Sequence, residues 1–129
     1  MDPTKEEERA YYALRLMQVQ SEELRRQLAA LQQAYVEAQA AHATLSAITQ
    51  AGKEALLPIG SGVLAKAKGL EKTVLVEQGA GVYAENESEQ ALKTVSERAE
   101  KLAEAARQTA AELEELEKAA RETAGKLKR

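Results

Sequence analysis

Apolar residues recur at alternating steps of three and four over the first part of the chain, the spacing that gathers them on one side of an α-helix. The seven-residue repeat assigns ten core positions there, eight of them apolar: Leu14, Met17, Ser21, Leu24, Leu28, Leu31, Tyr35, Ala38, His42 and Leu45. Thr4 followed by Glu7 matches a capping box, and Gly52 is a natural helix stop. The pattern predicts a coiled-coil helix over residues 4–51.

A second segment with the same period occupies the end of the chain. Nine of its eleven core positions are apolar: Leu92, Val95, Ala99, Leu102, Ala106, Thr109, Leu113, Leu116, Ala120, Thr123 and Leu127. Asn86 can cap this helix, with Glu89 at the third helical position. We therefore expect a second coiled-coil helix over residues 86–129. Similar lengths and a short connection favour an antiparallel hairpin of the two helices.

The middle of the chain, residues 52–85, changes from a period of seven to a period of two. It holds four short apolar runs, and Gly60-Ser61-Gly62 and Gly79-Ala80-Gly81 join them in pairs. Short strands joined by glycine-containing loops predict two β-hairpins. Two isolated hairpins are marginally stable, and their edges and apolar faces need further strands. We expect oligomerisation through the apolar hairpin residues Leu57, Ile59, Val63, Ala65, Val74, Val76, Val82 and Tyr83.

These elements predict a mainly α fold with a small β region, in one domain of 129 residues. The net charge of -3 leaves no basic field for a nucleic-acid backbone, and the absence of Cys excludes disulfides and thiolate chemistry. No apolar run reaches the length needed to cross a membrane, and the acidic start lacks the features of a signal peptide. The sequence thus predicts a cytoplasmic protein without nucleic-acid or membrane partners.

Candidate catalytic chemistry is sparse. The two glycine loops lack the strand-to-helix context of a phosphate-binding loop, and His42, the only histidine, cannot form a histidine metal cluster alone. The carboxylates are interleaved with Lys and Arg on helix surfaces, which indicates a solvated face. We expect neither an enzyme nor a cofactor or metal.

The central residues resemble a known family. The segments LPIGSGV (57–63), KAK (66–68) and VLVEQGAGVYAE (74–85) are similar to the hairpin region of archaeal-type prefoldin alpha subunits. Beta-type subunits of the prefoldin family carry one hairpin, so two hairpins favour the alpha type. The resemblance implies that the hairpins assemble into an oligomeric β-barrel of two alpha and four beta subunits, from which six coiled coils project.

The resemblance also implies an activity. Prefoldins are chaperones that bind unfolded proteins without ATP and transfer them to a group II chaperonin. Client binding then needs exposed apolar side chains near the free ends of the helices. The outward candidates are Tyr11, Tyr12, Leu16 and Val19, and frayed helix ends add Leu14, Met17 and Leu127. The alternative for the outward four is scattered surface apolar residues without a role, and core packing explains Leu14 and Met17 fully.

A structural protein is the main alternative function. The same hairpins can build a ring or filament in which the coiled coils act as spacers, without transfer of any client. Mass measurement with and without a beta-type partner separates a closed mixed hexamer from an open polymer of this chain.

Overall fold

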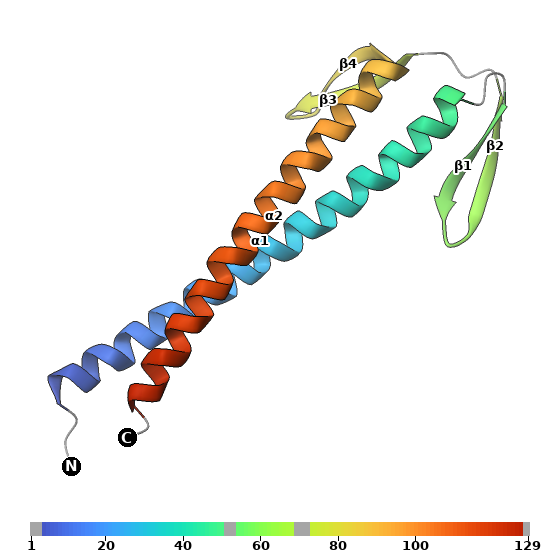
Figure 1. Ribbon diagram of the computed structural model, residues 1–129. Helices are drawn as coiled ribbons and strands as arrows, with labels where there is room; N and C mark the ends of the chain where they lie inside the picture. Colours follow the sequence, from blue (N-terminus) through green and yellow to red (C-terminus); the bar gives the residue numbers. More distant parts are fainter. Residues whose placement is uncertain (1–3, 51–53, 69–72, 128–129) are drawn as a thin grey trace. The chain divides into compact units, whose positions relative to one another are not determined.

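The computed structural model describes residues 4–50, 54–68 and 73–127 (Figure 1). The elements follow in the order α1 (Lys5–Gln50), β1 (Glu54–Gly60), β2 (Val63–Lys68), β3 (Thr73–Gly79), β4 (Val82–Glu87) and α2 (Ser88–Leu127). Two long helices with two antiparallel β-hairpins between them confirm the predicted fold class. The chain divides into two compact units: residues 1–33 with 102–129, and residues 34–101.

Helix α1 begins where the capping signature places it. The backbone N–H of Glu7 donates to Oγ1 of Thr4 at 3.2 Å, and the N–H of Glu8 donates to the Thr4 carbonyl at 3.0 Å. The acidic first turn also suits the positive end of the helix dipole. The predicted stop at Gly52 lies outside the described residues.

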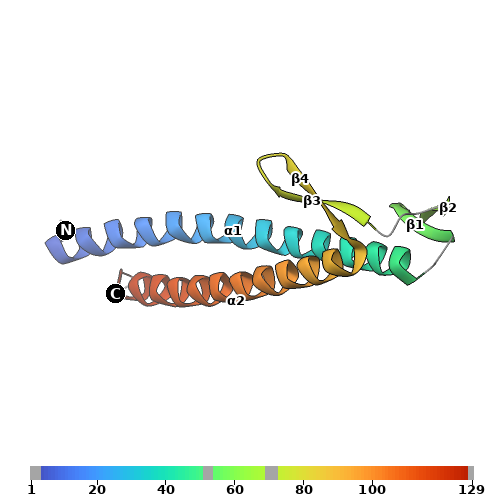
Figure 2. The same ribbon diagram turned by 90° about the horizontal axis from the view of Figure 1, so that it is seen from above.

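In the first unit, the beginning of α1 lies beside the end of α2, and the two run antiparallel (Figures 1 and 2). Every predicted core position of this unit is half-buried or buried, and Ser21 is 4% exposed. Arg25 joins the helices on the solvent side, with its Nη2 2.9 Å from Oε1 of Glu117. The seven-residue assignment is therefore confirmed here.

In the second unit, three elements supply the buried core. Leu45 of α1, Val76 of β3 and Ala91 of α2 are at most 9% exposed, and Val74 and Leu92 pack against them. One face of the β3–β4 hairpin is thus covered by helices of its own chain. Small Ala91, with no exposed surface, leaves room for Val76 to approach.

The two hairpins share one architecture. In each, a two-residue turn has positive φ at both positions, Ser61 and Gly62 in the first and Ala80 and Gly81 in the second. Such turns match the twist of the flanking strands. The register shifts just before each turn, and Gly60 pairs with Val63 as Gly79 pairs with Val82, 19 residues later. The repeat covers all pairs from Glu54↔Lys68 and Thr73↔Glu87 to the turns, so the hairpins are two versions of one unit.

The predicted start of the second helix is wrong. Asn86 does not cap α2: it lies in β4 and pairs with Val74, and the helix begins at Ser88. The strand extends because each further pair satisfies backbone groups that a helix start would leave unpaired. Glu89 remains in the first turn of α2.

Candidate binding surfaces

The hairpins carry most of the exposed bulky apolar surface in the described part of the chain. Seven of the twelve exposed large hydrophobic residues lie on them: Leu56, Ile59, Val63, Leu64, Leu75, Val82 and Tyr83. Strand residues alternate between faces, and in β3 this alternation buries Val74 and Val76 but exposes Leu75. A strand that is apolar on both faces is typical of a sheet covered on both sides. The outer hairpin faces are therefore candidate contact surfaces.

The predicted oligomerisation residues fall into two groups. Ile59, Val63, Val82 and Tyr83 are exposed, whereas Leu57, Ala65, Val74 and Val76 are half-buried or buried. The sequence analysis missed three exposed residues, Leu56, Leu64 and Leu75. Alternation around the buried position Val76 was the signal for Leu75, but it requires knowing which face the helices cover.

Each hairpin is also incomplete along its edges. β1 pairs only with β2 and β3 only with β4, so each described strand has one edge without a partner strand. Unpaired N–H and C=O groups along such edges accept further strands. Pro58 interrupts the donors of β1, because proline has no N–H. The β2 and β4 edges contain no proline.

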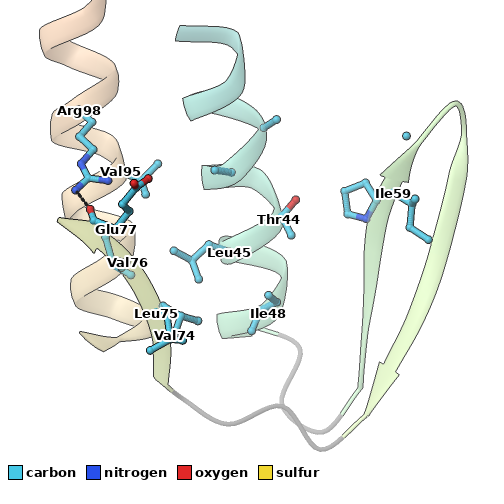
Figure 3. A pocket seen from close by; sticks show the side chains of 15 residues that line it. Thr44, Leu45, Ile48, Ile59, Val74, Leu75, Val76, Glu77, Val95 and Arg98 are labelled. Atoms are coloured by element: carbon cyan, nitrogen blue, oxygen red, sulfur yellow. Dashed lines mark hydrogen bonds between the residues drawn. The ribbon is translucent and has the colours of Figure 1, made fainter. Parts of the chain in front are cut away.

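An open apolar cleft of about 640 Å³ lies in the second unit (Figure 3). Leu45 and Ile48 of α1, Ile59 of β1 and Val74 and Val76 of β3 contribute to its lining. Arg98 of α2 borders the cleft and donates from Nη2 to the Glu77 carbonyl at 2.8 Å. The apolar surface of the hairpins thus continues into a depression next to the buried core.

The predicted client-binding residues lie in the first unit, on the first turns of α1. Tyr11, Tyr12, Leu16 and Val19 are all exposed. Tyr12, Leu16 and Val19 follow the i, i+4, i+7 spacing, so they form one row on the helix surface. We call these three residues the tip row.

The other predicted tip residues have different surroundings. Leu14, Met17 and Leu127 are half-buried at core positions of the helix pair. Their burial is the packing that the seven-residue repeat predicts. Client contact by these three stays a prediction that requires the helix ends to open.

Local electrostatics gives no sign of acid–base chemistry. Hydrogen bonds and charge attraction from Arg107 lower the pKa of the exposed Glu104 carboxyl. The described residues hold no group of three or more metal-ligating side chains. Among them, no helix is long and apolar enough to span a membrane. The candidate sites are thus surfaces for macromolecular contact.

Comparison with known proteins agrees with this fold. The family described as "Prefoldin subunit" matches residues 17–129. The cryo-EM structure of filamentous PFD from Methanocaldococcus jannaschii superposes with a TM-score of 0.65 at 28% identity, covering 90% of this chain and 98% of that chain. No curated protein sequence matches. The family match over most of the chain, together with two long helices and the intervening hairpins, shows that the chain belongs to the prefoldin family.

Proposed function

We propose that this chain is an alpha-type prefoldin subunit that holds unfolded proteins without ATP and passes them to a group II chaperonin. The prefoldin family is a family of non-enzymatic chaperones, and the chain belongs to it. The observation that carries the proposal is the tip row. Tyr12, Leu16 and Val19 expose apolar surface at the end of the helix pair away from the hairpins' sequence position.

The tip row suits contact with unfolded chains. Its side chains point away from the packed core positions, so they stay accessible when the helix pair is intact. Tyr12 is 68% exposed and combines an apolar ring with a hydroxyl that tolerates water. One such row buries little area and binds weakly, whereas several rows in one assembly raise the affinity through effective concentration.

Assembly through the hairpins completes the proposal. Two hairpins favour the alpha type, and exposed apolar faces with unpaired edges favour contacts with other subunits. The partners proposed are four beta-type subunits for every two copies of this chain, in the cytoplasm. The hairpins then form a shared barrel, and the helix pairs carry the tip rows.

The test replaces Tyr12, Leu16 and Val19 together with Ser in the assembled complex. Suppression of aggregation of a denatured protein, measured by light scattering without nucleotide, should fall by at least half while the assembly mass stays unchanged. Val36→Ser is the matched control, because Val36 is 57% exposed and Val19 is 59% exposed. Full suppression by the triple variant would remove the tip row from the function.

A structural role is the second candidate. The observation that favours it is the similarity to a prefoldin from Methanocaldococcus jannaschii described as filamentous. In that role the hairpins join copies of this chain into a polymer, and the helix pairs act as spacers. Open polymers that persist with a beta-type partner and do not suppress aggregation would support it over the chaperone proposal.

A further inference from the structure

The two hairpins repeat one backbone pattern but carry opposite charges. β2 reads VLAKAK and β4 reads VYAENE, and their residues occupy equivalent places in the repeat. Lys66 pairs with Leu56 in the first hairpin, as Glu85 pairs with Leu75 in the second. A lysine on one hairpin thus stands where the other has a glutamate.

Lys66 and Glu85 lie on exposed surface. Their cross-strand neighbours Leu56 and Leu75 are exposed, so both charges lie on the hairpin face that the chain's own helices leave open. Neither side chain forms an ion pair within the described residues. Each therefore has its charge available to a partner outside its own hairpin.

The edges next to these charges have no partner strand. β2 and β4 each pair on one side only, and they belong to separate two-stranded sheets within the chain. Leu64 of β2 and Tyr83 of β4 are equally exposed, at 58% each. Each strand therefore offers an open edge, one large apolar side chain and one charge, in the same order along the strand.

We propose that the β2 edge of one copy of this chain pairs with the β4 edge of a second copy, with Lys66 beside Glu85. This inference rests on the proposed assembly through the hairpins and adds its polarity. Aligned at equivalent positions, the strands place Leu64 beside Tyr83 on the same face as the ion pair. The chain carries both halves of the contact, so a second copy satisfies it.

The charges select this pairing against the alternatives. Pairing β2 with β2 would set lysines side by side, and pairing β4 with β4 would do the same with glutamates; like charges directly opposite are destabilising. A contact between two different edges is head-to-tail. Repeated, it gives a ring if the rotation closes and a filament if it does not.

The experiment uses two single charge reversals in the full chain. K66E makes both edges acidic and E85K makes both basic, so each variant alone opposes like charges at the contact. At low salt, each should need a roughly tenfold higher concentration than the original chain for half-assembly in sedimentation velocity. K101E and E114K are matched controls, because they reverse exposed charges on α2 and should assemble normally.

An equimolar mixture of the two variants gives the decisive result. The acidic β4 of K66E meets the basic β2 of E85K, and the basic β4 of E85K meets the acidic β2 of K66E. Assembly should return to within about twofold of the original chain, because every head-to-tail contact again joins opposite charges. A contact within one chain would not be restored by mixing.

Three results would overturn the inference. They are unchanged assembly of both single variants, failure of the mixture to recover, and an original chain that shows no self-association at any concentration. The first two leave the chaperone proposal standing, since aggregation suppression by the complex with a beta-type subunit measures that function separately.

Discussion

Nη2 of Arg98 lies 2.8 Å from the carbonyl oxygen of Glu77 and donates a hydrogen bond to it. The contact joins α2 to β3 across 21 residues of sequence, next to the buried cluster of Leu45, Val76 and Ala91. A strand approaching β3 at this point would compete with the guanidinium for the same oxygen. The contact thus holds the second hairpin on its own chain and makes the β3 edge less suitable for pairing than the β4 edge.

Arg98→Met tests this contact. Methionine keeps most of the apolar stem but removes the donor, so the free energy of unfolding should fall by about 0.5–1.5 kcal/mol. Amide hydrogen exchange in β3 should accelerate by about the corresponding factor. Arg121→Met, at an exposed position of α2, is the control. Identical β3 exchange in the two variants would show that Arg98 does not hold the hairpin.

A double-mutant cycle on Arg25 and Glu117 tests the alignment of the helix pair. Both side chains are partly exposed, at 57% and 36%, so solvent screens their 2.9 Å contact. We expect a coupling of about 0.2–1 kcal/mol from chemical denaturation of the two Ala variants and the double variant. The coupling should shrink in 1 M salt. No coupling at low salt would contradict this register of α1 against α2.

Ala80→Gly tests the turn geometry of the second hairpin. Ala80 has φ of 50°, a conformation that is costly for a residue with a Cβ. Glycine should raise the free energy of unfolding, by up to about 1 kcal/mol, although it also frees the unfolded chain. Gly81→Ala, at φ of 78°, should change stability in the opposite direction. Destabilisation by Ala80→Gly as large as that by Gly81→Ala would exclude this turn.

The Glu104 carboxyl provides a pH-dependent signal. Its hydrogen bond and charge attraction with Arg107 lower its pKa, so the deprotonated form is favoured in the folded protein. The associated stabilisation is present above the ordinary glutamate pKa and is lost as the pH falls through the lowered pKa. Arg107→Met should raise the Glu104 pKa in an NMR titration, whereas Arg121→Met should not. An unchanged pKa after Arg107→Met would contradict the assigned cause.

The fold could be predicted largely because each element has a strong local signal. A seven-residue repeat such as the one from Leu14 to Leu45 has few structural solutions, and glycine pairs around Ser61 and Ala80 mark tight turns. The Asn86 prediction failed because a local capping signal competed with strand pairing to Val74, a contact that only the folded hairpin reveals.

The contact surfaces were harder to predict than the elements. Burial of Val76 depends on Leu45 and Ala91, which lie 31 and 15 residues away in sequence. Without that packing, Val76 and Leu75 read as equivalent apolar strand residues. The outward tip row was easier, because the helical period alone separates Tyr12 and Leu16 from the core position Leu14.

The mass of the chain in solution tests the central claim most directly. Light scattering after size-exclusion chromatography, with and without a beta-type prefoldin subunit, should give masses well above the 14.0 kDa of one chain. With the partner, the account predicts a closed mixed hexamer. A single 14.0 kDa species under both conditions would show that the hairpins need no other strands, and it would contradict the proposed assembly.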